Sequence, residues 1–133
     1  MDKKFNEIEI SNFRGFDSIK IDRLSGLNVF VGANNVGKST ILEAVFMLVG
    51  MANPIMPMRV NYRRTQTNSD MDSLKYLFHN IDFNNQPLLK AKTGTSVRRL
   101  TFSPFFRNTT EASSSDISLK STVKQLNFDF DVH

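Results

Sequence analysis

Residues 32–39 read GANNVGKS, and this stretch decides how the rest of the chain is interpreted. It fits the phosphate-binding pattern G-x-x-x-x-G-K-[ST] at every defined position. Glycine makes up about 7% of an average protein. A chance match at all four defined positions is therefore expected in well under about 1% of chains of this size. The pattern therefore predicts a loop that holds the phosphates of a nucleotide.

The sequence on either side of the loop has the order strand, loop, helix that such a site requires. Residues 27–31 are almost wholly apolar, which predicts a strand covered on both faces. Residues 38–51 predict a helix with almost no polar face, so we expect other structure to bury it on both sides. The alternative, a glycine turn and a surface lysine before an ordinary core helix, does not explain this agreement between motif and context.

The position of each residue in the motif predicts its role. We expect Lys38 to reach the β- and γ-phosphates, the Ser39 hydroxyl to ligate Mg²⁺ and the Thr40 hydroxyl to lie near the α-phosphate. The glycines allow backbone N–H groups to turn toward the phosphates, and the helix N-terminus adds partial positive charge. The predicted nucleotide-binding residues are Gly32, Asn34, Asn35, Val36, Gly37, Lys38, Ser39 and Thr40. No Asn-Lys-x-Asp run that would read guanine occurs, which favours ATP over GTP.

Beyond the loop, the pattern of apolar residues predicts a β-rich chain. Alternation over residues 8–21 indicates a hairpin before the loop, and residues 87–102 indicate a second hairpin. Between them, Pro54 and Pro57 predict a long connection, with a short helix that carries Met71, Leu74, Leu77 and Phe78 on its apolar side. Residues 107–116 predict a loop, followed by strands near residues 117–119 and 126–132. We therefore expect one domain in three segments, residues 1–50, 51–86 and 87–133.

The composition excludes several classes of function. The 133 residues include no cysteine and two histidines, which rules out disulfides, thiolate metal sites and cysteine nucleophiles. The longest apolar run is far shorter than a membrane span, so we expect a cytoplasmic protein that does not contact the membrane. The formal net charge of +4 would suit a polyanionic partner, but the basic residues are dispersed, which favours ordinary surface charge.

The acidic residues that hydrolysis requires are not apparent. No run of four apolar residues followed by Asp-Glu or Asp-Asp comes after the loop. The carboxylates of Asp129 and Asp131 alternate with aromatic residues, which indicates a half-exposed strand instead. We therefore expect this chain to bind nucleotide better than it hydrolyses it, because hydrolysis needs a second acidic site for Mg²⁺ and a group that orients water.

Two stretches carry a resemblance to a known family. Residues 8–16 read IEISNFRGF and residues 27–44 read LNVFVGANNVGKSTILEA. Together they resemble the N-terminal lobe of the ABC-type ATPases that include RecF, SMC proteins and OLD-family nucleases, and residues 74–104 are similar to bacterial AAA family ATPases. The resemblance implies an α/β P-loop lobe with a mixed β-sheet and added antiparallel strands around the P-loop helix, a lobe that is incomplete as it stands.

The resemblance also implies partners and further site residues. Asn12 and Arg14 become secondary candidates for contact with the base or phosphates, although Arg14 fits a solvated turn residue equally well. Gln66 and Gln86 are the candidates for a Q-loop. A homodimer or partner chain would complete the ATP site, later segments would supply the Walker B and signature motifs, and the full-length protein would act on DNA in repair or phage defence. A small P-loop kinase and a nucleic-acid-binding module with a nucleotide site are the alternatives.

Overall fold

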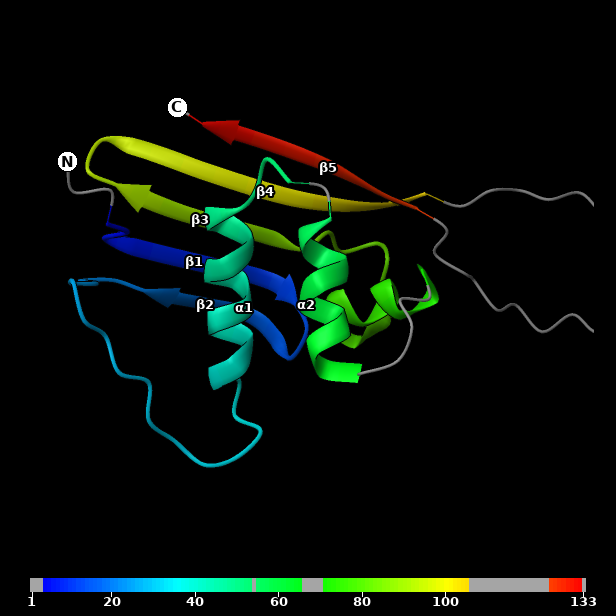
Figure 1. The fold of residues 1–133 in the computed structure, drawn as a ribbon, viewed down its shortest axis with the longest axis horizontal. Helices are drawn as coiled ribbons and strands as arrows, with labels where there is room; N and C mark the ends of the chain where they lie inside the picture. Colours follow the sequence, from blue (N-terminus) through cyan, green and yellow to red (C-terminus); the bar gives the residue numbers. More distant parts are fainter. Residues whose placement is uncertain (1–3, 54, 66–70, 106–124, 133) are drawn as a thin grey trace, which may run out of the picture.

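The computed structural model describes residues 4–53, 55–65, 71–105 and 125–132, which form an α/β structure (Figure 1). Its sheet has the strand order β2-β1-β3-β4-β5, and each strand is antiparallel to its neighbours. The strands are β1 (Glu7–Phe13), β2 (Phe16–Ile21), β3 (Leu88–Thr93), β4 (Ser96–Phe105) and β5 (Gln125–Val132). The helices are α1 (Lys38–Val49) and α2 (Met56–Thr65), with the 3₁₀ turns η1 (Met71–Leu77) and η2 (His79–Ile81).

The register of the sheet gathers apolar side chains on one face. Ile10 of β1 lies opposite Ile19 of β2 on one side and Leu89 of β3 on the other. Leu89 in turn lies opposite Leu100 of β4. Side chains alternate between the faces of a strand, so this alignment produces one continuous apolar surface. It forms the centre of the core, together with the buried residues Ile8, Ala91 and Phe102.

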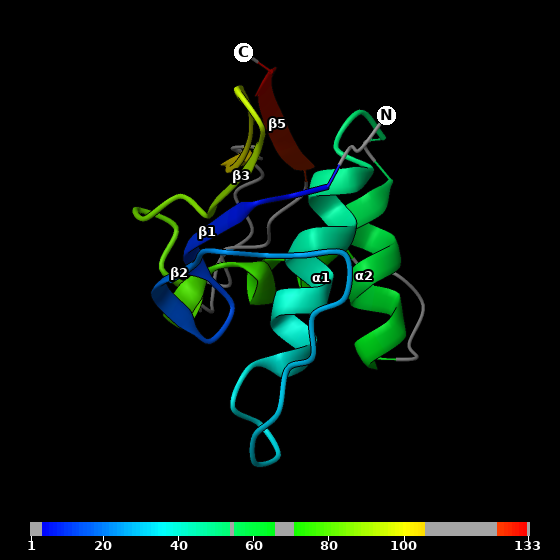
Figure 2. The same cartoon turned by 90° about the vertical axis from the view of Figure 1, so that its left-hand side faces the viewer.

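Helices α1 and α2 lie side by side on this apolar face of the sheet (Figures 1 and 2). The α1 residues Ala44, Met47 and Leu48 are fully buried against it. Arg98 of β4 donates a hydrogen bond from Nη1 to the Leu48 carbonyl at 3.3 Å, which places a cation at the C-terminal end of α1. A positive charge there is favourable because the carbonyl end of a helix carries partial negative charge.

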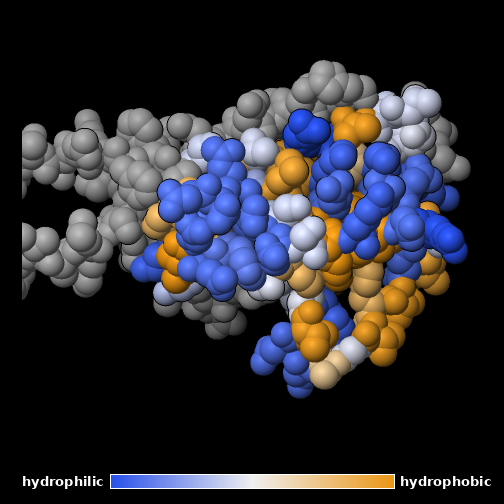
Figure 3. All heavy atoms as spheres, turned by 180° about the vertical axis from the view of Figure 1, so that it is seen from behind, coloured by the Kyte–Doolittle hydropathy of each residue, from blue (hydrophilic) through white to orange (hydrophobic). Residues whose placement is uncertain are grey.

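The opposite face of the sheet is polar (Figure 3). Glu7 lies 2.9 Å from Lys92 and 3.2 Å from Lys20, and Lys90 lies 3.2 Å from Glu9. These pairs link β2, β1 and β3 across the strands. The antiparallel pairing of β1 with β2 and of β3 with β4 confirms the two hairpins predicted from alternation, and β5 confirms the strand predicted near residues 126–132.

The predicted strand over residues 27–31 is wrong. These residues form an irregular segment, and Leu27, Val29 and Val31 are 82%, 75% and 89% exposed. No backbone–backbone hydrogen bond joins residues 27–31 to another described residue, and a strand exists only where a neighbour accepts its hydrogen bonds. The expected mixed sheet is therefore corrected to one whose described strands are all antiparallel. An orange stripe at the lower right of Figure 3 marks the segment before α1.

Two further expectations are corrected. Helix α1 is not buried all round, because Leu42 and Val49 are 60% and 63% exposed. The predicted connection over residues 51–86 contains a helix, α2, in which Pro57 occupies the first turn, where its missing N–H costs no helical hydrogen bond. The predicted short helix is present as the 3₁₀ turn η1. The loop at residues 107–116 and the strand near 117–119 lie outside the described residues.

Candidate nucleotide-binding site

The loop over residues 32–37 leads directly into the N-terminus of α1. Gly37 has φ 102°, and its carbonyl accepts the first helical hydrogen bond from Ile41 N at 3.0 Å. Asn35 is also in the left-handed region, with φ 63°, which asparagine tolerates better than most residues. These two reversals turn the chain sharply just before the helix. Free N–H groups at a helix N-terminus attract anions, so the geometry suits a phosphate.

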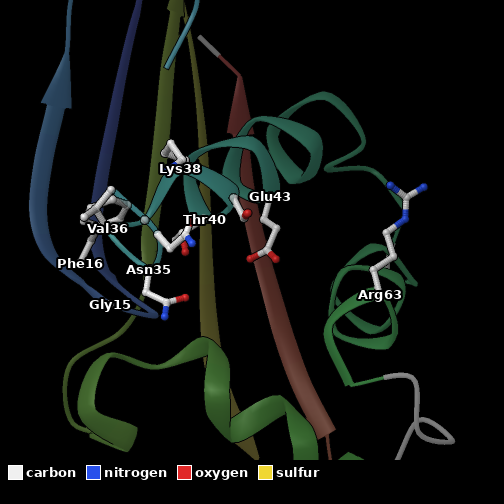
Figure 4. Close-up of a pocket in the computed structure, with 11 residues that line it drawn as sticks. Gly15, Phe16, Asn35, Val36, Lys38, Thr40, Glu43 and Arg63 are labelled. Carbon is white, nitrogen blue, oxygen red and sulfur yellow. The ribbon is translucent and has the colours of Figure 1, made fainter. Parts of the chain in front are cut away.

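A cleft of about 900 Å³ opens beside this helix end (Figure 4). It is lined by Gly15, Phe16, Asn34, Asn35, Val36, Gly37, Lys38, Ser39, Thr40, Glu43 and Arg63. Seven of the eight predicted loop residues, Asn34 to Thr40, are therefore gathered around one space. Gly32 lies at the start of the loop and does not line the cleft.

The side chain of Lys38 reaches back across the loop that precedes α1. Its ammonium group donates hydrogen bonds to the backbone carbonyls of Gly32 and Ala33. The carbonyl oxygens hold the positive charge at the mouth of the loop, where phosphate oxygens could replace them as acceptors. The ammonium group of a lysine has three donors and no acceptor, so it can bind phosphate oxygens in place of the two carbonyl oxygens.

The hairpin of β1 and β2 forms one wall of the cleft, through Gly15 and Phe16. Figure 4 shows the Phe16 side chain beside the loop that carries Val36. Phe16, Glu43 and Arg63 line the site without having been predicted from the sequence. The available signal was indirect: Glu43 follows Ser39 by four residues on a helix, a spacing that puts both on one face.

Arg14, a predicted nucleotide contact, is paired with Glu43, a residue that lines the cleft. Its Nε lies 2.7 Å from Glu43 Oε2, and its Nη2 donates to Asn61 Oδ1 at 2.7 Å. Asn12 donates from Nδ2 to the Gln86 carbonyl at 3.5 Å. Neither Asn12 nor Arg14 lines the cleft, although Gly15, next to Arg14, does. Their direct contact with nucleotide stays a prediction.

The remaining candidate groups can be placed in the same way. Among the residues that the structure describes, no three or more His, Cys, Asp or Glu side chains are grouped to hold a metal ion. Gln86 donates to Ser103 Oγ at 2.9 Å, away from the cleft, and Gln66 lies outside the described residues.

Within the described ranges, no helix combines the length and the apolarity needed to cross a membrane.

Comparison with known proteins gives the site its family context. The model of the AAA ATPase domain family matches residues 4–131. An "ATP/GTP phosphatase" of Helicobacter pylori is 35% identical over 79 residues, which are 56% of this chain and 21% of that protein. No solved structure matches.

Two RecF proteins add to this similarity. A "DNA replication and repair protein RecF" of Lactococcus lactis is 44% identical over 45 residues, 34% of this chain and 12% of the relative. The RecF protein of Streptococcus gordonii is 32% identical over 88 residues, 66% of this chain and 21% of the relative. The chain thus spans about a fifth or less of these curated relatives. Because the family model covers nearly its whole length, the chain belongs to the AAA ATPase domain family.

Proposed function

We propose that this chain is the ATP-binding N-terminal lobe of a P-loop ATPase of the RecF, SMC and OLD-like group. Residues 32–39 would be its Walker A loop. The observation that carries the proposal is the cleft at the N-terminus of α1, where the residues from Asn34 to Thr40 meet around one space. Helix N–H groups, the Lys38 ammonium and two hydroxyl groups supply the donors that a polyphosphate needs.

The donor set also fits Mg²⁺ bound together with nucleotide. The exposed side chain of Ser39 would supply one hydroxyl ligand, with phosphate oxygens and water completing a shell of the kind that Mg²⁺ prefers. Glu43, the single carboxylate lining the cleft among the described residues, lies against Arg14. The proposal is therefore that the isolated chain binds ATP and Mg²⁺ without efficient hydrolysis.

Hydrolysis would belong to a longer protein that adds Walker B and signature motifs. The exposed apolar residues of the segment 27–31 support this part of the proposal, because they lie next to the loop and no strand among the described residues pairs with them. The similarity to RecF proteins, named for DNA replication and repair, supports a DNA-related role such as repair or phage defence. A cytoplasmic location and a homodimer or partner chain that completes the ATP site belong to the same proposal.

The test is calorimetric titration of the chain with ATP and Mg²⁺, comparing Lys38→Ala with the native protein. Losing one charge-assisted contact costs about 1.5–3 kcal/mol, so the dissociation constant should rise roughly 10- to 100-fold. Lys20→Ala is the matched control, since it removes the same charge on the far face of the sheet. Equal affinity of the native chain and Lys38→Ala would refute the site. Rapid ATP turnover by the isolated chain would refute the requirement for later segments.

A further inference from the structure

Glu43 places a negative charge in a cleft that suits a polyanion. It lies on α1 four residues after Ser39, and Figure 4 shows its carboxylate close to Thr40. Among the described lining residues it is the single acidic one. A bare carboxylate there would repel the phosphates of a nucleotide, and this repulsion would be strong because part of the cleft wall is protein of low dielectric constant.

Arg14 removes that charge from the cleft. Its Nε lies 2.7 Å from Glu43 Oε2, and the two side chains are 6% and 15% exposed. Burial of this kind keeps the pair from being screened by salt as a surface pair would be. Arg14 does not line this cleft but a neighbouring pocket of about 350 Å³, together with Gly15 and Asn61, so it meets the carboxylate from outside the cleft.

Several other elements hold Arg14 in this position. Its Nη2 donates to Asn61 Oδ1 of α2 at 2.7 Å. Its backbone N donates to the Leu77 carbonyl at 2.9 Å, and its carbonyl lies 2.8 Å from His79 Nδ1. The residue has φ 50°, a strained value for an arginine that persists only where the surroundings determine it. A side chain and backbone fixed in this way are not free to swing toward a phosphate.

We infer that Arg14 is a positioning residue of the nucleotide site that acts through Glu43. It cancels the charge of the Glu43 carboxylate and fixes its direction, and the cleft thereby accepts a triphosphate. This inference rests on the proposed function. It differs from a direct contact between Arg14 and the nucleotide, because it requires Glu43 to be present for Arg14 to matter.

The test is a double-mutant cycle of Arg14→Met and Glu43→Gln, with ATP and ADP titrated into each variant. Arg14→Met exposes the carboxylate charge and should weaken ATP binding at least about tenfold, and ADP binding less, because ADP carries less charge. Adding Glu43→Gln should restore ATP affinity to within about threefold of the native chain. If the double variant stays as weak as Arg14→Met, Arg14 contacts the phosphates directly and the inference is wrong.

Glu43→Gln alone keeps the test decisive if Arg14→Met does not fold. It leaves the Arg14 charge uncancelled beside the cleft, so ATP should bind about two- to fivefold more tightly, with a smaller gain for ADP. Unchanged or weaker ATP binding by Glu43→Gln would overturn the inference. Lys38→Ala, measured in parallel, separates the two proposals: if it binds ATP like the native chain, the proposed function itself fails.

Discussion

The ring of Phe16 lies so close to Gly37 that a Cβ atom on Gly37 would clash with Phe16 Cζ. Real Cβ atoms do not come this near to another carbon, so a side chain at position 37 would displace either the Phe16 ring or the loop. Glycine is thus required here for two reasons, space and its φ of 102°. The hairpin that precedes the loop shapes the loop through this contact.

Gly37→Ala should therefore impair nucleotide binding by at least about tenfold, through both the left-handed strain and the clash with Phe16. Calorimetric titration with ATP and Mg²⁺ would measure this loss. Gly94→Ala is the matched control, since Gly94 has φ 59° but nothing within 4 Å of its Cβ position. It should lower stability by about 1–2 kcal/mol and leave affinity unchanged. Comparable affinity losses in both variants would contradict the role of the Phe16 contact.

Two positions on α1 should respond very differently to truncation. Met47 is fully buried against the sheet, so Met47→Ala should lower the free energy of unfolding by about 2–5 kcal/mol. Leu42 is 60% exposed on the same helix, and Leu42→Ala should change stability by no more than about 0.5 kcal/mol. Urea denaturation would measure both. A large loss for Leu42→Ala would show that other structure covers this side of the helix.

The exposed valines of the segment 27–31 should make the chain associate with itself. Backbone that pairs with no described strand and carries exposed apolar side chains is a template for pairing between chains. The double substitution of Val29→Thr and Val31→Thr should reduce association, as followed by sedimentation velocity over a range of protein concentrations. Val49→Thr, another exposed valine but on α1, should leave association unchanged. Equal association of the native chain and the double variant would show that this segment is not the cause.

Glu7 should contribute to acid sensitivity. Hydrogen bonds from Lys92, the larger cause, and from Lys20 hold the pKa of the Glu7 carboxyl below its ordinary value near 4.5. A lowered folded pKa means that this contribution is complete above the ordinary value and is lost as pH falls from about 4.5 through the folded pKa. Glu7→Gln should therefore flatten the fall of the urea midpoint below about pH 4.5. Equal slopes for the native chain and Glu7→Gln would contradict the prediction.

The turn that leads into α1 and the two hairpins could be predicted from the sequence because their determinants are local. Glycine and lysine positions define the loop, and alternation defines the hairpin strands. The segment 27–31 could not be predicted in the same way. Its residues have the composition of a buried strand, but strand formation depends on a partner distant in the sequence. Helix α2 could not be predicted from its proline, because a proline breaks the interior of a helix but is compatible with the first turn, which Pro57 occupies.

The Arg14–Glu43 pair shows the same limit at the site. The two residues are 29 positions apart. Neither the turn sequence around Arg14 nor the helix sequence around Glu43 indicates that the two side chains form a pair. The sequence allowed Arg14 to be a solvated turn residue or a nucleotide contact. The buried ion pair arises from tertiary packing of the hairpin tip against α1 and α2, which no local pattern encodes.

The segment 27–31 ends one residue before Gly32, where the loop begins. Whatever partner covers this segment would fix the direction in which the chain enters the loop. A loop already ordered by that partner would lose less conformational entropy when a nucleotide binds. Thermodynamic linkage then requires the reverse as well, so that bound nucleotide strengthens the partner's hold by the same factor. The three exposed apolar side chains of the segment 27–31 would thus make binding of the partner and binding of the nucleotide a single cooperative equilibrium.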